Sequence, residues 1–147
     1  MTAKTVLVAA AALLFSVPAI ADKDPVFSTD AGAIRGFDPV AYFNEKRPVE
    51  GDSKISHRWN GAIWHFSSEE NRAAFEATPE KYAPAYGGYC AYAVANGYTA
   101  STDPEAWSVV NGRLFLNYSL GVKKRWEKNT SGYIKSGDAN WPGVLTE

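Results

Sequence analysis

Residues 55–66 read ISHRWNGAIWHF, a pattern that predicts a β-hairpin. Two runs rich in aromatic and β-branched residues, 55–59 and 62–66, flank the pair Asn60-Gly61. Asn and Gly best tolerate the positive φ angles of a tight type I′ turn, so this pair is a strong hairpin signal. A two-residue turn at this point places His57 opposite Trp64.

This register places the two histidines of the chain on opposite faces of the hairpin. His57 shares its face with large apolar residues, which we expect to point into the core. His65 lies on the other face, which is more polar because it carries Ser56 and Arg58, and which we expect to be more open. Side chains alternate between the faces, so the two imidazoles cannot bind one ion together unless a β-bulge shifts the register.

A second hairpin is predicted around Asn111-Gly112, which joins residues 107–110 to residues 113–117. With so many large side chains, the two hairpins are expected to share one antiparallel sheet. Capping residues predict several short helices packed around them. The predicted class is therefore α+β, with a small antiparallel sheet from two Asn-Gly β-hairpins and several short helices.

The helix starts are predicted from N-cap residues. Ser67 and Glu70 form a capping box for a helix that runs to about Ala77. Residues 88–96 read as a second helix, and Ser119 caps a third. Further short helices or turns are predicted after Asp38-Pro39, after Thr78-Pro79, after Asp103-Pro104 and at residues 130–139.

The N-terminus has the pattern of a secretory signal peptide that covers residues 1–21. Lys4 provides the positive charge, residues 5–17 are almost entirely apolar, and the small-residue sequence AIA at 19–21 fits a cleavage site. The apolar run is shorter than the roughly 20 residues that a membrane-spanning helix needs. We therefore expect a soluble single domain at 22–147 without a membrane span, located in a bacterial periplasm or secreted.

Composition narrows the classes of function. Lys and Arg number 15 against 16 Asp and Glu, and there is no basic stripe that would indicate nucleic-acid binding. Met1 is the only methionine, which excludes a Met-rich Cu(I) site, and one cysteine with two histidines cannot build a four-ligand zinc site in one chain. The five Trp and eight Tyr either bury area in a small core or line a ligand cleft, such as a sugar site.

Cys90 is the only cysteine, and an unpaired thiol is unusual in an oxidising compartment. Two glycines just before it predict a turn into a helix whose first turn would hold the thiol and lower its pKa. There it could serve as a metal ligand or a nucleophile. Alternatively, Cys90, Ala93 and Val94 form a stripe of small apolar residues at helical spacing, which favours a thiol buried in the core.

Several segments, in order along the chain, resemble the YHS-domain family. They are FDPVAYF at 37–43, WHFSSEEN at 64–71, Phe75 and PEKY at 79–82, while YGGYCA at 86–91, DPxxW at 103–107 and GxLFLN at 112–117 are similar to exported, single-domain bacterial members. The resemblance covers roughly residues 36–141 and implies binding of a metal, with copper as the leading candidate. The metal-binding members carry a cysteine at the position of Ser67, so this chain lacks that ligand.

These observations lead to three functional predictions. The first is an exported ligand-binding protein of the YHS family that holds a transition-metal ion such as copper, with Cys90, His65 and His57 as candidate ligands. The second is a module that binds a protein or a small molecule through its aromatic surface, with Cys90 structural. The third is a thiol-dependent enzyme that uses Cys90 and a histidine. The chain has no phosphate loop, dinucleotide fingerprint or Gly-x-Ser-x-Gly elbow, which favours a binding protein over an enzyme.

Overall fold

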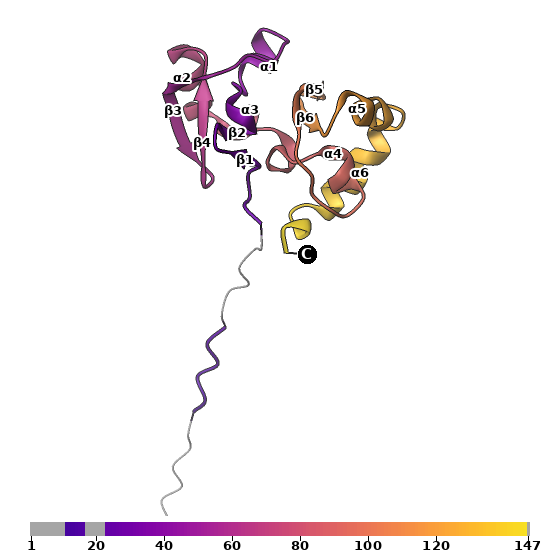
Figure 1. The fold of residues 1–147 in the computed structure, drawn as a ribbon. Helices are drawn as coiled ribbons and strands as arrows, with labels where there is room; N and C mark the ends of the chain where they lie inside the picture. Colours follow the sequence, from indigo (N-terminus) through magenta and orange to yellow (C-terminus); the bar gives the residue numbers. More distant parts are fainter. Residues whose placement is uncertain (1–10, 17–22, 147) are drawn as a thin grey trace, which may run out of the picture.

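Two Asn-Gly hairpins and a set of short helices make up most of residues 11–16 and 23–146, the part of the chain that the computed structural model describes (Figure 1). This part contains six α-helices and three two-stranded antiparallel sheets, which confirms the predicted α+β class. The strands are β1 (Ser28–Thr29), β2 (Gly32–Ala33), β3 (Asp52–Trp59), β4 (Ala62–Phe66), β5 (Asp103–Val110) and β6 (Arg113–Asn117). The helices are α1 (Ala41–Asn44), α2 (Glu69–Ala77), α3 (Pro79–Tyr82), α4 (Ala91–Ala95), α5 (Leu120–Glu127) and α6 (Thr130–Asn140), with 3-10 segments η1 (Ile34–Gly36), η2 (Ala85–Gly88) and η3 (Gly143–Thr146).

The segment predicted as a signal peptide is described only in part. Residues 11–16 form neither helix nor strand. Residues 1–10 and 17–21 of that segment, and the expected start of the mature domain at residue 22, lie outside the described residues. Among the described helices, none is both long and apolar enough to cross a membrane.

The first hairpin has the predicted register over most of its length. β3 and β4 pair His57 with Trp64 and Ser56 with His65. Alternate residues of β4 are buried, whereas Ile63 between them is 41% exposed, which confirms the predicted core face. The register shifts only at the open end of the hairpin, before Ser56.

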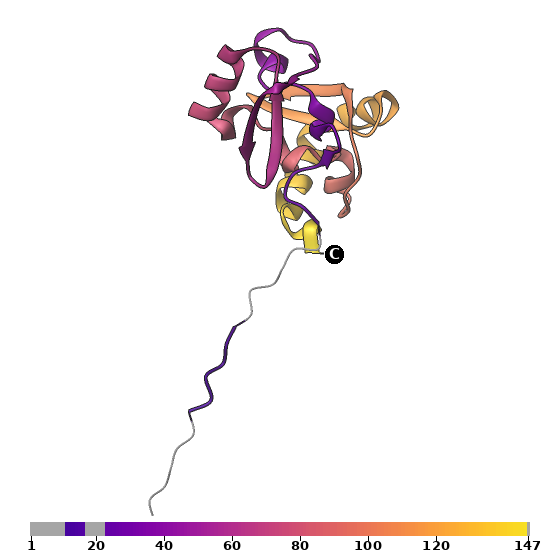
Figure 2. The ribbon, with the colours of Figure 1, turned by 60° about the vertical axis from the view of Figure 1, so that its left-hand side comes forward.

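The second hairpin also has its predicted register, with Val109 opposite Leu114 and Ser108 opposite Phe115. The expected shared sheet is corrected by the structure, because β3–β4 and β5–β6 are separate two-stranded sheets. The strands of the two hairpins run in different directions (Figure 2), so their edges cannot form a hydrogen-bonded ladder. The hairpins meet through their side chains instead.

Strand β6 joins two hydrophobic clusters. Leu114 and Leu116 pack in a cluster with Trp64 of the first hairpin. Phe115, on the opposite face of the same strand, packs in a second cluster with Trp126 of α5. We call residues 28–83 the N-lobe and residues 84–146 the C-lobe, and Figure 1 shows these two parts side by side.

The arm before β1, residues 23–27, connects the two lobes. The Lys23 backbone N–H donates to the Leu145 carbonyl at 3.1 Å, and the Phe27 N–H donates to the Gly87 carbonyl at 2.9 Å, so the arm is tied to the C-lobe. Its Val26 side chain is buried in the N-lobe cluster. The beginning and the end of the folded part are therefore held beside each other.

One predicted helix start is shifted by a residue. Helix α2 is capped by Ser68, whose hydroxyl accepts a hydrogen bond from the Asn71 N–H at 3.1 Å, and not by Ser67 as predicted. The Ser67 hydroxyl instead donates to the buried carboxylate of Asp38 at 2.7 Å. This contact with a residue far away in the sequence determines which of the two adjacent serines caps the helix.

Some other predicted helix starts are confirmed. The Ser119 hydroxyl accepts from the Val122 N–H at 3.1 Å at the start of α5. Helix α3 begins at Pro79, as predicted. Helix α1 begins later than predicted, because its N-cap residue is Val40 and not Asp38; Asp38 accepts from the Val40 N–H at 2.9 Å in the turn before it. The predicted helix at 130–139 is α6.

Candidate functional site

Cys90 lies at the N-cap position of α4 and not in its first turn as predicted, because the helix begins at Ala91. Gly88 has a φ of 85° and belongs to the preceding 3-10 segment. Cys90 is 1% exposed; its thiol donates to the Asn117 side-chain oxygen at 3.6 Å and accepts from the Tyr118 N–H at 3.3 Å. Burial raises the pKa of Cys90, although backbone hydrogen bonds oppose this shift. A buried, protonated thiol fits the structural role and lacks the access that a nucleophile needs.

His57 contacts α2 from the core face of β3. Its Nδ1 atom lies 3.3 Å from a carboxylate oxygen of Glu76, and its ring lies edge-on to Phe75 with centroids 6.3 Å apart. The side chain is 33% exposed. These contacts give His57 a structural role, because they join the hairpin to helix α2.

His65 lies on the opposite face, which is less open than predicted because β2 and η1 cover part of it. A Cβ atom at Gly32 or Gly36 would lie 3.3 Å from the imidazole ring, and one at Gly51 would lie 2.7 Å from the His65 Cβ atom. The residue is half-buried. His65 is therefore packed closely against three glycines, an arrangement that the sequence pattern of the hairpin did not indicate.

The structure places the three predicted metal ligands in three different environments. Cys90 contacts β6, His57 contacts α2, and His65 contacts β2 and η1. Within residues 11–16 and 23–146, no three His, Cys, Asp or Glu side chains are grouped closely enough to hold a metal ion. The copper site stays a prediction.

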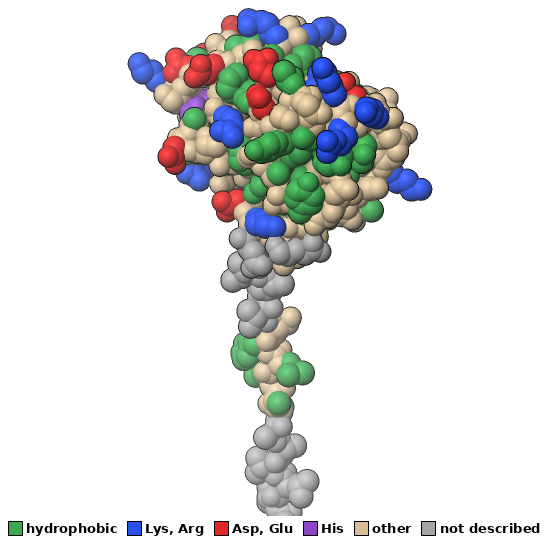
Figure 3. Space-filling model, turned by 45° about the vertical axis from the view of Figure 1, so that its right-hand side comes forward, with side chains coloured by type: hydrophobic (Ala, Val, Ile, Leu, Met, Phe, Trp, Pro, Cys, Tyr) green, Lys and Arg blue, Asp and Glu red, His purple; other side chains and the backbone are tan. Residues whose placement is uncertain are grey.

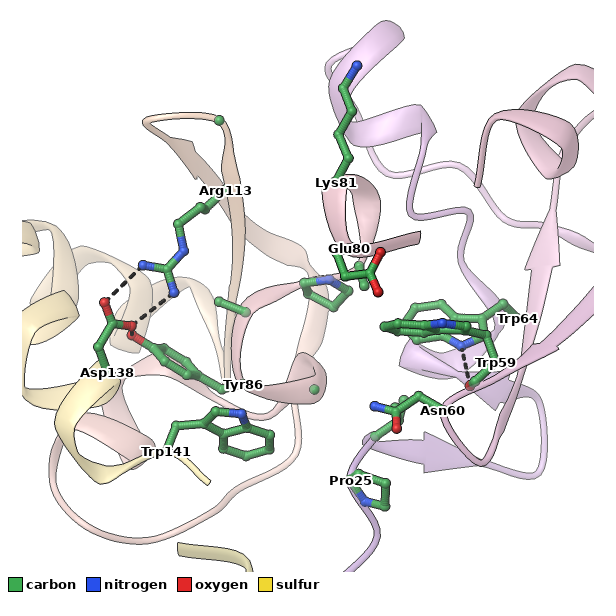
Figure 4. A pocket seen from close by; sticks show the side chains of 16 residues that line it. Pro25, Trp59, Asn60, Trp64, Glu80, Lys81, Tyr86, Arg113, Asp138 and Trp141 are labelled. Atoms are coloured by element: carbon green, nitrogen blue, oxygen red, sulfur yellow. Dashed lines mark hydrogen bonds and ion pairs between the residues drawn. The ribbon is translucent and has the colours of Figure 1, made fainter. Parts of the chain in front are cut away.

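A cleft of about 600 Å³ lies between the two lobes (Figure 4). Asn60 and Gly112 both line it, so residues of the two hairpin turns, far apart in the sequence, belong to one cleft. The remaining lining residues come from the arm, the hairpins, the segment from α3 to η2, and α6 with the residue that follows it; they are Pro25, Val26, Trp59, Trp64, Glu80, Lys81, Ala83, Pro84, Ala85, Tyr86, Gly87, Arg113, Asp138 and Trp141. A volume within roughly 300–1,000 Å³ is typical of a small-molecule site.

Two indole rings lie on opposite walls of the cleft. Trp59 belongs to the N-lobe and Trp141 to the C-lobe (Figure 4). Trp59 packs against Phe75, with ring centroids 5.7 Å apart, while Trp141 packs against Tyr86 and Tyr89 at 6.1 and 6.2 Å. Because each indole is supported by core aromatics, its orientation is set before any ligand arrives.

A fixed polar group forms the C-lobe side of the cleft. The Arg113 guanidinium donates two hydrogen bonds, of 2.9 and 3.0 Å, to the two carboxylate oxygens of Asp138. The Tyr86 hydroxyl donates to the same carboxylate at 3.0 Å. The hydrogen bond from Arg113 holds the pKa of Asp138 below its usual value. Burial raises the pKa of Tyr86, and the hydrogen bond that its hydroxyl donates to Asp138 raises this pKa further. At neutral pH the group therefore consists of a guanidinium, a carboxylate and a neutral phenol.

The chain matches no model of a known protein family, no curated protein and no solved structure. The resemblance to the YHS-domain family therefore stays a prediction. What the cleft can bind is inferred below from the residues that line it.

The charged side chains that line the cleft balance each other. Lys81 and Arg113 carry positive charge, and Glu80 and Asp138 carry negative charge. Of the described residues that line the cleft, none is Cys, His, Ser or Thr. This lining can bind and orient a ligand, but it does not supply the side chains that most often act as nucleophiles. The two turns and the abundance of tryptophan are visible in the sequence, but their place in one cleft is not.

Exposed apolar side chains form a second feature of the surface. Figure 3 shows hydrophobic side chains gathered on one face of the folded part, with Lys and Arg around them. The large exposed hydrophobic residues include Tyr98, Tyr118 and Leu120, and none of these three lines the cleft. The aromatic residues of this protein thus serve the core, the cleft and the open surface.

Proposed function

We propose that this protein is an exported, non-enzymatic binding protein whose ligand site is the cleft between the two lobes. The export part of the proposal rests on the signal-peptide pattern at residues 1–21. The binding part rests on the cleft, which combines concave shape, aromatic walls and a small number of fixed polar groups.

The observation that carries the proposal is that Trp59 and Trp141 lie on opposite walls of the cleft. Both indoles are held by aromatic neighbours, and the Arg113–Asp138–Tyr86 group is held by its own hydrogen bonds. A site that is already ordered loses little conformational entropy on binding, which favours affinity. In this proposal Cys90 is structural.

The experiment is a titration monitored through the tryptophan side chains. Uniformly ¹⁵N-labelled protein is titrated with a library of small polar and aromatic compounds, and the five indole N–H signals are followed by two-dimensional NMR. A ligand of the cleft should shift the signals of Trp59 and Trp141 and leave that of Trp126, in the C-lobe core, in place. A library that shifts neither cleft signal overturns the proposal.

Two variants connect the signals to the site. Trp141→Ala should weaken binding of any such ligand by about tenfold, because removing an aromatic contact costs roughly 0.5–1.5 kcal/mol beyond its buried area. Trp107→Ala is the matched control, since Trp107 is also half-buried and packs on Tyr42, but does not line the cleft. Equal losses in the two variants would contradict a ligand site in the cleft.

A further inference from the structure

We propose that the cleft binds an uncharged carbohydrate, a short oligosaccharide. This inference rests on the proposed function and names the chemistry of the ligand. Three features of the cleft carry it together: an indole ring on each of its two walls, balanced charge, and side chains around the indoles that both donate and accept hydrogen bonds.

The indole rings provide the first argument. A pyranose ring has faces made of C–H groups, and a flat aromatic ring buries such a face well. Trp59 and Trp141 lie on opposite walls (Figure 4), and each packs against an aromatic side chain, Phe75 for the first and Tyr86 for the second. Rigid aromatic side chains lose little entropy on contact with a ligand, so the cleft is prepared for a ligand with flat apolar faces.

Balanced charge provides the second argument. Arg113 and Asp138 neutralise each other through two hydrogen bonds, and the other two charged lining residues, Glu80 and Lys81, have opposite signs. The four charges of the lining sum to zero, so the cleft as a whole has no net charge that would attract an anionic or a cationic ligand. The lining therefore favours a neutral ligand over an anionic or a cationic one.

Hydrogen-bonding groups in the lining favour a sugar over a neutral aromatic compound. The Asn60 amide offers a donor and an acceptor, the Glu80 carboxylate accepts, and the Arg113 guanidinium has N–H donors beyond those given to Asp138. Figure 4 shows Asn60 and Glu80 reaching into the space between the lobes. An aromatic hydrocarbon would leave these groups without partners, whereas the hydroxyl groups of a sugar both donate and accept.

The size of the cleft sets the length of the ligand. A volume of about 600 Å³ lies in the range of sites for drug-sized molecules. A disaccharide or trisaccharide has this size, whereas a long polysaccharide would not fit inside the cleft. The probes are therefore the neutral trisaccharides cellotriose, maltotriose and tri-N-acetylchitotriose. Their charged counterparts are the cationic trimer of glucosamine and the anionic trimer of galacturonate.

The test is the NMR titration of the full chain with these five sugars and with indole. At least one neutral trisaccharide should shift the indole signals of Trp59 and Trp141, with an affinity about tenfold or more above that of both charged trimers. If indole or a library compound shifts these signals while all neutral trisaccharides fail, the carbohydrate inference is overturned and the proposed function stands. If nothing shifts them, both are overturned. Tighter binding of a charged trimer also overturns the inference.

Variants localise the binding. Trp59→Ala and Trp141→Ala should each lower the affinity for the neutral trisaccharide by about tenfold, and Trp107→Ala should leave it unchanged. Trp59→Phe and Trp141→Phe keep an aromatic ring and should retain part of the affinity, so they test the same point should an alanine variant fail to fold. Full affinity in folded Trp59 and Trp141 variants would place the sugar elsewhere and overturn the inference.

Discussion

Asp38 is fully buried, and both of its carboxylate oxygens accept hydrogen bonds. One oxygen accepts from the Val40 and Ala41 N–H groups at 2.9 and 3.4 Å. The other accepts from the Ser67 N–H, the Ser67 hydroxyl and the Asn71 amide at 2.8, 2.7 and 2.8 Å. A single side chain thus fixes the start of α1 and joins it to the start of α2. The segments FDPVAYF and WHFSSEEN are close in space for this reason.

We predict that Asp38→Ala lowers the free energy of unfolding by about 3 kcal/mol or more, because several buried donors lose their acceptor together. Urea unfolding monitored by tryptophan fluorescence measures the loss. Asp52→Ala is the control, since Asp52 is exposed and accepts one hydrogen bond, from the Lys54 N–H at 2.8 Å; it should cost about 1 kcal/mol or less. Similar losses of unfolding free energy in both variants would show that the buried network around Asp38 contributes no more to stability than one exposed hydrogen bond.

Cys90 gives a second prediction at the level of a single residue. Because burial raises its pKa, iodoacetamide should label the native protein very slowly at pH 7 and quickly only in urea. The unfolded chain loses its thiol proton at about pH 8.5, whereas the folded chain keeps it to higher pH. The thiol's contribution to stability is therefore complete below pH 8.5 and is lost as pH rises through the raised value of the folded state.

The measurement compares the wild type with Cys90→Ala. The difference between their free energies of unfolding should be constant at neutral pH and should shrink above about pH 8.5, since the variant has no thiol to ionise. Rapid labelling of the native protein, or a difference that grows with pH, would instead indicate an accessible thiol with a lowered pKa.

Helix α6 approaches the cleft closely because it carries Gly137. A Cβ atom at this position would collide with the Tyr86 hydroxyl, the group that donates to Asp138 on the same helix. Alanine normally stabilises a helix interior by up to about 1 kcal/mol relative to glycine. We predict the opposite sign for Gly137→Ala, a loss of about 1–3 kcal/mol, because the ring of Tyr86 must move.

The matched control is Gly121→Ala in α5, where the nearest atom to an added Cβ would be the Ser119 hydroxyl oxygen at 3.8 Å. This variant should be neutral or more stable by up to about 1 kcal/mol. Thermal unfolding by circular dichroism measures both variants. A stabilised Gly137→Ala would mean that the contact between Tyr86 and α6 is looser than the structure shows.

At the level of the elements, local signals predicted the hairpins well and their arrangement poorly. Asn60-Gly61 and Asn111-Gly112 fixed both registers near the turns, because a two-residue turn leaves one pairing. Two other features depend on packing against distant residues. They are the shifts of register at the open ends of the hairpins and the separation of the hairpins into two sheets. The same holds for the choice of Ser68 over Ser67 as a cap, which Asp38 decides from far away in the sequence.

The candidate site was the least predictable part for a related reason. In the sequence, Cys90, His57 and His65 are the obvious candidate site residues, because thiols and imidazoles carry recognisable chemistry. The cleft is built by ordinary aromatic and polar residues such as Trp59 and Trp141, which come together only when the lobes pack. The pattern around each of them resembles that of a core residue, so nothing local distinguished the walls of the cleft from the core.

At the level of the whole molecule, the cleft exists only if the two lobes are held in one position. Strand β6 gives Leu114 and Leu116 to the N-lobe cluster and Phe115 to the C-lobe cluster. The arm adds a second connection, because the Phe27 N–H donates to Gly87 while Val26 is buried against the N-lobe. A strand with both faces buried cannot leave one cluster without exposing the other, so the lobes should not unfold separately.

We therefore predict a single cooperative transition in urea. The indole N–H signals of Trp64 in the N-lobe and Trp126 in the C-lobe should disappear with the same midpoint. Leu116→Ala and Phe115→Ala should each move both midpoints together, with losses of about 2–5 kcal/mol typical of buried positions. Leu120→Ala, which truncates an exposed side chain, should change them by no more than about 0.5 kcal/mol. If Phe115→Ala moved only the Trp126 midpoint, the lobes would be independent units, and a cleft with fixed walls would require a ligand to bring them together.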